Sequence, residues 1–264
     1  MLDRLISLIN GDALSALVFK GFSVVKGPAL LILLVVFLTP EQQGYWYLIT
    51  NLGALAYMAD FGLTSLTMQH IANNTKFELV TLNARDSFLN IIKSSYTFLY
   101  ASLGIVALLL LPAGFYLMDS EAPLLRYAWF FYIISSVPVH FLLFELSILQ
   151  GLGGVVQSYK WRSSYVVLSL TVCIVLLVSG MSLMSLGISN LIASLIIIPF
   201  VLQNFNRSDV KGNELHTQFQ TVIDNKTRFQ YIASWLSGYA MFFMIVPLVM
   251  HFEGAVVAGQ VGMA

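Results

Sequence analysis

The sequence predicts an all-α, polytopic membrane helix bundle, on two grounds. Of its 264 residues, 58% are hydrophobic and only 10% are charged, with a mean hydropathy of +0.82. Soluble domains carry about 25% charged residues, so this chain has too few charges to cover a water-facing surface of its size. The chain also contains long uncharged stretches that are apolar all round rather than alternating, which favours membrane helices over the strands of a barrel.

The uncharged stretches divide the chain into spans of about 20 or more residues each. The stretch 163–206 is too long for one span, and Ser179-Gly180-Met181-Ser182 favours a turn, so we expect a helical hairpin there. An eighth apolar segment begins at Gly254 and reaches Ala264. The complete predicted spans are residues 14–38, 44–70, 91–117, 124–150, 163–181, 185–202 and 230–252.

The N-terminal residues and the basic residues predict how the chain sits in the bilayer. Residues 1–12 place their apolar side chains on one helical face, which predicts a short interfacial helix. With the N-terminus inside, the outside loops carry only Arg126, so the positive-inside rule supports that orientation. The inside loops then carry Arg4, Lys76, Arg85, Lys93, Lys160, Arg162, Arg207, Lys211, Lys226 and Arg228.

Asp60 is the best placed of the ionisable residues at membrane depth. Such residues are costly in a bilayer, so each is a candidate functional residue. Within the predicted helix 44–70, Asp60 shares a face with Tyr57 and Thr64 at three- and four-residue spacing. This polar stripe either lines a water-filled cavity or forms a close contact between helices.

Three further charged residues are candidates. Lys20 and Lys26 point about 120° apart on a helix, so they cannot line one narrow site together. Lys20 either extends to the inner interface or faces a cavity. Lys26 is deeper and precedes Gly27-Pro28; it either faces a cavity or pairs with Asp60. Glu145 lies nearer the inner end of its span, where it is either interfacial or a cavity residue.

The sequence contains no pattern that predicts an enzyme, a cofactor or a metal site. It has no phosphate-binding loop, dinucleotide-binding motif, nucleophile elbow or zinc-protease motif. Lys plus Arg equals Asp plus Glu at 13 each, which excludes nucleic-acid binding. Cys173 is the only cysteine, and the histidines have no second ligand at metal-binding spacing. These histidines are His70, His140, His216 and His251, of which we expect His140 to be hydrogen-bonded within the bundle.

Two turns have similar surroundings and suggest an internal repeat. Phe37-Leu-Thr-Pro-Glu-Gln-Gln-Gly44 and Phe252-Glu-Gly-Ala-Val-Val-Ala-Gly259 both end a long span and precede a new one. Residues 1–228 would then form a six-span N-terminal lobe with its interfacial helix. Residues 229–264 would begin a second, parallel lobe.

The segment around Asp60 resembles a known family. Gly44-Tyr-Trp-Tyr-Leu-Ile-Thr-Asn-Leu-Gly-Ala-Leu-Ala-Tyr-Met-Ala-Asp-Phe-Gly-Leu63, continuing to Gln69-His-Ile-Ala72, resembles the second helix of polysaccharide (O-antigen) flippases. These flippases belong to the multidrug/oligosaccharidyl-lipid/polysaccharide exporter superfamily. Ala59-Asp-Phe-Gly-Leu63 carries most of the resemblance, and the preceding turn Pro40-Glu-Gln-Gln-Gly44 fits it.

The resemblance implies two six-helix lobes around a central cavity and transport by alternating access. It implies an undecaprenyl-diphosphate-linked oligosaccharide as substrate, moved from the inner to the outer leaflet of the bacterial inner membrane. Basic cavity residues would bind the diphosphate, here Lys26 and then Lys20, and other polysaccharide assembly proteins would be partners. Because the sequence ends within an eighth apolar segment, we expect a truncated chain that lacks the second-lobe site residues.

Three alternatives remain open at this point. A multidrug efflux carrier of the same superfamily would favour a carboxylate in the first span, where this sequence has Lys20 and Lys26. A membrane glycan enzyme, such as a polymerase or acyltransferase, would favour a large outside loop, whereas the predicted outside loops are short. An inactive truncated product is the third, because an exposed half-span is a poor end for a membrane chain.

Overall fold

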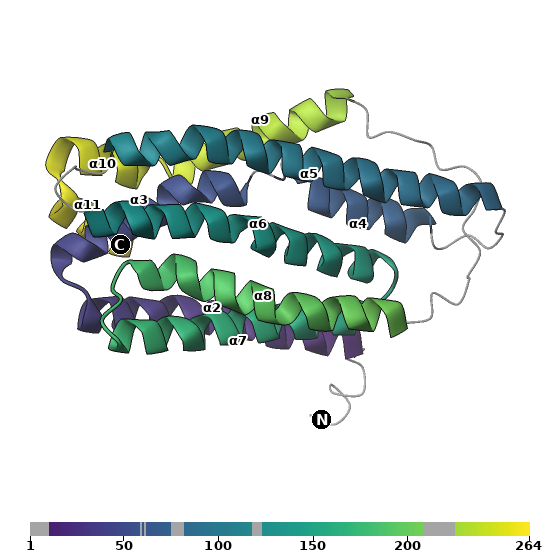
Figure 1. The fold of residues 1–264 in the computed structure, drawn as a ribbon, viewed down its shortest axis with the longest axis horizontal. Helices are drawn as coiled ribbons and strands as arrows, with labels where there is room; N and C mark the ends of the chain where they lie inside the picture. Colours follow the sequence, from purple (N-terminus) through teal and green to yellow (C-terminus); the bar gives the residue numbers. More distant parts are fainter. Residues whose placement is uncertain (1–10, 59, 61, 75–81, 118–122, 208–224) are drawn as a thin grey trace, which may run out of the picture.

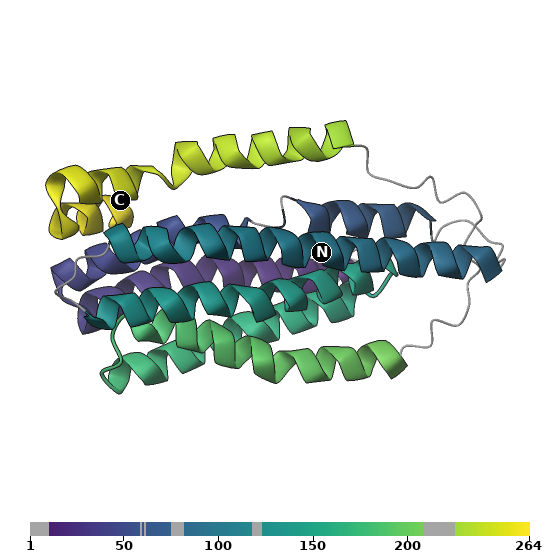
Figure 2. The ribbon, with the colours of Figure 1, turned by 45° about the horizontal axis from the view of Figure 1, so that its top comes forward.

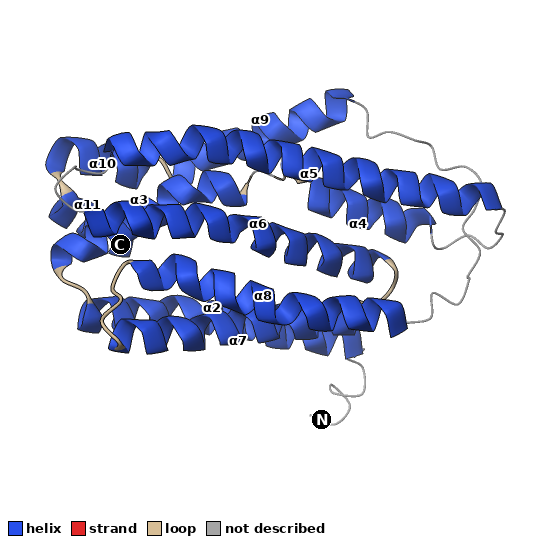
Figure 3. Ribbon diagram, in the orientation of Figure 1, coloured by secondary structure: helices blue, strands red, loops and turns tan. Residues whose placement is uncertain are grey.

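The helices run roughly along one long axis, with one helix at the centre (Figure 1). This computed structural model describes residues 11–58, 60, 62–74, 82–117, 123–207 and 225–264. Every regular element among them is a helix (Figure 3), which confirms the predicted all-α class. The helices are α2 (Gly11–Phe37), α3 (Pro40–Tyr57), α4 (Leu63–Asn74), α5 (Leu82–Leu117), α6 (Pro123–Gly151), α7 (Val155–Val178), α8 (Met184–Arg207), α9 (Asn225–Phe242), α10 (Ile245–Glu253) and α11 (Ala255–Met263).

The chain is a multi-pass membrane protein by the length and composition of its helices. Among the described residues, five helices are long and apolar enough to cross a membrane, namely α2, α5, α6, α7 and α8. They correspond to predicted spans 14–38, 91–117, 124–150, 163–181 and 185–202, which are confirmed as helices. The pair α9 and α10, bent by 41°, makes a sixth candidate.

Two predicted spans are not single helices. The predicted helix 44–70 is wrong, because α3 ends at Tyr57 and α4 begins only at Leu63, with Met58, Asp60 and Gly62 outside both helices. The predicted helix 230–252 is divided between α9 and α10. Apolar composition alone did not reveal either break. The predicted interfacial helix 1–12 lies almost entirely outside the described residues.

The hairpin predicted within 163–206 is confirmed, but its first helix begins earlier. The turn lies between Val178 and Met184 and contains Gly180 at φ +81°. Helix α7 begins at Val155, so Lys160 and Arg162 lie on a helix rather than in a loop. Gaps between charges mark the apolar part of a helix, and a helix can extend past them at the bilayer surface, where charged side chains remain hydrated.

A built turn joins α2 to α3. Thr39 is the N-cap of α3: its hydroxyl accepts from the Gln42 backbone N–H at 3.3 Å, and the Gln42 side chain accepts from the Thr39 N–H at 3.1 Å. Pro40 follows at the first helical position, where its missing N–H has no cost. The buried Gln43 amide donates to the carbonyls of Leu34 and Leu38, so the end of α2 has partners as well.

Helix α6 is the central element, with α3, α4 and α5 on one side and α7 and α8 on the other (Figure 1). In its membrane-spanning window, 72% of the residues are buried, more than in any other candidate span. Its closest neighbour is α8, where Gly187 lies against the α6 backbone at Phe131 and Tyr132. Small residues at this contact allow the backbones to approach, as is typical of helices packed in a membrane.

The C-terminal helices pack most closely on the rest of the bundle at one end. Figure 2 shows α9 running along the outside, with α10 and α11 at the end of the bundle beside α3. Helix α11 packs on the first half of α3, and Gly259 lies directly against Gly44. The two turns that suggested an internal repeat therefore lie next to each other in space.

We predict that Gly44→Ala destabilises the protein by about 1–3 kcal/mol, the usual range for overpacking. A Cβ at Gly44 would overlap the backbone carbonyl of Ala255, which cannot rotate away. Thermal unfolding in detergent measures the effect. The matched control is Gly104→Ala on α5, where a Cβ meets nothing within 4 Å. Equal melting temperatures for the two variants would contradict the packing of α11 on α3.

Candidate functional site

The candidate site is built around the break between α3 and α4. Helix α3 ends at Tyr57, and Gly62, at φ +77°, precedes α4. Such a positive φ favours glycine, so the sequence marks this position. A break at membrane depth frees backbone N–H and C=O groups that need partners inside the protein.

Asp60 supplies partners on the α4 side of the break. Its carboxylate accepts from the backbone N–H of Gly62 at 3.2 Å and of Thr64 at 3.4 Å. Acidic side chains are favourable at a helix N-terminus, where the unpaired N–H groups carry partial positive charge. Asp60 is half-buried and serves as a local cap of α4.

The predicted polar stripe of Tyr57, Asp60 and Thr64 is therefore wrong. It needed one continuous helix, and these residues lie on either side of the break or within it. Thr64 is half-buried and contributes its backbone N–H to Asp60. Further along α4, the buried Thr67 hydroxyl donates to Ser95 of α5 at 3.4 Å.

Tyr57 instead joins a hydrogen-bonded group that links three helices. The Asn190 amide of α8 donates to the Tyr57 hydroxyl at 3.2 Å. The Asn190 side-chain oxygen accepts from the Tyr165 hydroxyl at 3.2 Å and from the Ser169 hydroxyl at 2.8 Å, both on α7. We call Tyr57, His140, Tyr165, Ser169 and Asn190 the Tyr57 network. Each hydrogen bond between helices satisfies groups that the bilayer cannot.

His140 connects the network to the central helix α6. One ring nitrogen, Nε2, lies 3.1 Å from the Tyr57 carbonyl at the end of α3, and Nδ1 lies 2.7 Å from the Ser136 carbonyl. The rings of His140 and Tyr57 are 5.7 Å apart, and that of Tyr132 is 5.4 Å from Tyr57. His140 is buried with a carbonyl oxygen beside each ring nitrogen, and the nitrogen that bears the proton donates to one of them, as predicted for a histidine hydrogen-bonded inside the bundle.

Glu145 lies elsewhere, at the contact between α5 and α6. It is buried and accepts a hydrogen bond from the Tyr96 hydroxyl. The Tyr96 ring packs edge-on against Phe144 at 4.7 Å. Within the bundle this buried carboxyl lies beside the aromatic ring of Tyr96, and its depth in the bilayer, which separates the interfacial from the cavity alternative, stays a prediction.

The two lysines of α2 are placed differently from each other. Lys20 is exposed on the surface of α2. Lys26 is half-buried and lies near Cys173 of α7. No ion pair of Lys26 with Asp60, or with any other described residue, is present. The pair proposed from the sequence is therefore not formed in the part of the chain that the structure describes.

The six predicted site residues are thus not gathered in one place. Asp60 and Thr64 meet at the break, Tyr57 starts the network next to it, and Glu145, Lys20 and Lys26 lie apart. Sequence reasoning missed Tyr165, Ser169 and Asn190. The only signal for these three residues was that they are polar and lie within two apolar spans. The hairpin packs those two spans against each other. Within the described ranges, no group of three metal-ligating side chains is present.

We predict that Asn190→Ala destabilises the protein by about 2 kcal/mol, because it removes three bonds between helices worth about 0.6 kcal/mol each. The free energy of unfolding in mixed detergent micelles measures the loss. The control is Ser164→Ala on α7, whose hydroxyl donates only to the Lys160 carbonyl of its own helix. Similar losses for both variants would argue against the network as a link between helices.

Comparison with known protein families, curated proteins and solved structures finds no match for this chain.

Proposed function

We propose that the chain is part of a flippase for an undecaprenyl-diphosphate-linked oligosaccharide, an O-antigen unit or a related surface polysaccharide unit. It would move this lipid from the inner to the outer leaflet of a bacterial inner membrane by alternating access. In this proposal the N-terminus is cytoplasmic, and the partners are the lipid-linked substrate, the bilayer and other polysaccharide assembly proteins. The resemblance around Ala59-Asp-Phe-Gly-Leu63 gives the substrate class.

The contact between α3 and α11 supports alternating access most directly. Residues 225–264 pack most closely on the rest of the chain through α10 and α11, against the first half of α3. By the predicted orientation, this is the outer end of the bundle. Two lobes that pack most closely at one end can separate there and approach at the other.

The broken helices are a second support. Discontinuous spans in transporters place backbone polar groups and polar side chains at membrane depth, beside the path of the cargo. This chain has two breaks, at residues 58–62 and 243–244. The first of them has the Tyr57 network beside it. A glycan carries many hydroxyls, and tyrosine, serine and asparagine side chains are suitable partners for them.

Lys26 is the residue we propose for the diphosphate. It is half-buried in a span, and its ammonium has no hydrogen bond or ion pair with any described residue. An unpaired cation in a membrane is costly, which is why it indicates a function. A cation at this place repels organic cations, so the same observation disfavours the multidrug carrier.

A disulfide across the α3–α11 contact tests alternating access. A Cβ at Gly262 would overlap Cγ of Tyr47, the ring carbon that is bonded to the Tyr47 Cβ. Cysteines at positions 47 and 262 therefore lie within disulfide reach of each other. We expect Tyr47→Cys with Gly262→Cys, in a Cys173→Ser background, to lose transport on oxidation and to regain it on reduction. The assay is accessibility of a lipid-linked oligosaccharide to an external glycosidase in proteoliposomes, with protein expressed from its full reading frame.

The matched control is a disulfide that joins two helices of the same lobe. Ser185→Cys would pair with the native Cys173, since the two side chains are 3.9 Å apart between α7 and α8. Its oxidation is expected to leave transport unchanged. Full transport by the oxidised Tyr47–Gly262 pair would overturn the proposed movement.

We predict that Lys26→Gln lowers transport of the diphosphate-linked substrate about tenfold, while Lys26→Arg retains most of it. The reason is loss of one charge-assisted contact, and a tenfold change corresponds to about 1.4 kcal/mol. Lys93→Gln, at an exposed lysine of α5, serves as the control. Equal rates for Lys26→Gln and Lys93→Gln would remove Lys26 from the site without affecting the test of alternating access.

A further inference from the structure

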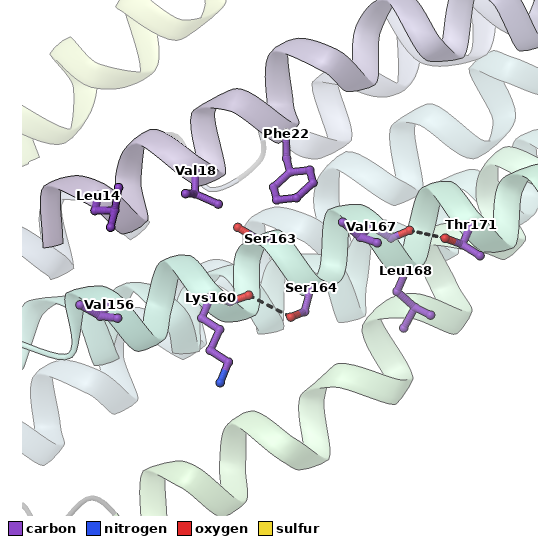
Figure 4. A pocket seen from close by; sticks show the side chains of 10 residues that line it. All are labelled: Leu14, Val18, Phe22, Val156, Lys160, Ser163, Ser164, Val167, Leu168 and Thr171. Carbon is purple, nitrogen blue, oxygen red and sulfur yellow. Dashed lines mark hydrogen bonds between the residues drawn. The ribbon is translucent and has the colours of Figure 1, made fainter. Parts of the chain in front are cut away.

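A long groove lies between α2 and α7 on the outside of the bundle (Figure 4). Its volume is about 720 Å³. In Figure 4, Val18 and Phe22 extend from α2 towards α7, and Ser163 extends from α7 towards α2. Phe19 and Tyr159, whose rings are 5.6 Å apart, hold the two helices together beside it. We call this space the α2–α7 groove.

The middle of the groove has mostly apolar side chains, and its few hydroxyls already donate hydrogen bonds within the protein. Its three hydroxyls donate to their own helix: Ser163 to Tyr159 at 2.9 Å, Ser164 to Lys160 at 3.0 Å and Thr171 to Val167 at 2.9 Å. No donor proton of these side chains is left for a ligand. The remaining lining residues, apart from Lys160, are Leu14, Val18, Phe22, Val156, Val167 and Leu168.

Lys160 is the one charged residue among the described lining residues. Its side chain is exposed, and its ammonium bonds to no described residue. Figure 4 shows it extending from α7 on the side away from α2, so the charge lies at the rim of the groove. An occupant that matches both the apolar middle of the groove and its charged rim must be apolar along the groove and anionic near Lys160.

The length of the groove matches one leaflet of a bilayer. From Val156 to Thr171 it follows α7 for about 22 Å, at the rise of an α-helix. One leaflet with its headgroups is about 20–22 Å thick. Lys160 lies in the second turn of α7, at the end of the span where a headgroup would be.

We propose that the α2–α7 groove binds an anionic glycerophospholipid, with an acyl chain along α2 and α7 and the headgroup phosphate at Lys160. Basic residues at the end of an apolar groove between membrane helices recognise anionic headgroups in this way. The site is separate from Lys26 and the Tyr57 network, so it does not depend on what the protein transports.

Native mass spectrometry of the delipidated protein tests the site, with phosphatidylglycerol as the probe and phosphatidylcholine as the zwitterionic comparison. We expect one phosphatidylglycerol to bind about fivefold more weakly to Lys160→Gln than to the wild type, the effect of one basic residue near a headgroup. Val18→Trp, which fills the groove, is expected to lose this binding, and phosphatidylcholine is expected to be insensitive to Lys160→Gln.

Two matched controls separate the groove from general lipid binding. Lys93→Gln removes an exposed lysine outside the groove, and Val24→Trp enlarges a side chain of α2 that is 72% exposed and does not line it. The proposal is overturned if either control equals its groove variant. It is also overturned if polyprenyl phosphate displaces bound phosphatidylglycerol at a lower concentration than added phosphatidylglycerol does, because the occupant would then be a cargo lipid. If Val18→Trp abolishes a dimer, the occupant would be a second copy of the chain, and the proposal is overturned as well.

Discussion

The requirement that every backbone polar group in a bilayer has a partner governs the arrangement of this bundle. The chain interrupts its second span at residues 58–62 and must satisfy the groups that the interruption frees. Asp60 accepts from two of the N–H groups on one side, and His140 reaches the Tyr57 carbonyl on the other. His140 thereby links the break to the central helix α6.

Helix α6 combines this role with close packing. Its buried serines donate to carbonyls of the same helix, as in Ser135 to Tyr132 at 2.7 Å and Ser147 to Leu143 at 2.8 Å. Such hydroxyls no longer need external partners, so the side chains act as small surfaces against neighbouring helices. On α8, Gly187 lies against the α6 backbone at Phe131 and Tyr132. Of the five long spans among the described residues, α6 has the lowest mean hydropathy and is also the most buried.

Gaps between charges located five of the seven predicted spans correctly, because charged side chains are costly along the whole length of a helix in a bilayer. They also implied continuous helices at 44–70 and 230–252, which the structure divides. The turn at Gly180 was also predictable from the local sequence, because its residues favour a turn and separate two apolar runs. The break at Asp60 was not predicted, because Ala59-Asp-Phe-Gly-Leu63 remains apolar enough to fit a helix. Gly62, at φ +77°, was the one local signal of the break.

The site was less predictable because its contacts are distant in sequence. Tyr57 was singled out from the sequence as a polar residue within an apolar stretch, but its partner Asn190 could not be found by spacing on one helix. The direction in which the Lys26 side chain points also depends on how α2 packs against α7. No local sequence pattern reveals that packing. Charge and periodicity locate residues along the membrane, whereas which helices face each other is decided by side-chain packing.

The distance in sequence between Tyr57 and Asn190 has a consequence in time. The two residues are 133 positions apart, so the ribosome makes them about 7–27 s apart at about 5–20 residues per second. During that interval Tyr57 has been made but its partner Asn190 does not yet exist. We expect the nascent α3 to stay at the insertion machinery, or beside water, until α8 arrives. The order of synthesis thus makes α8 the helix that completes the membrane assembly of this network.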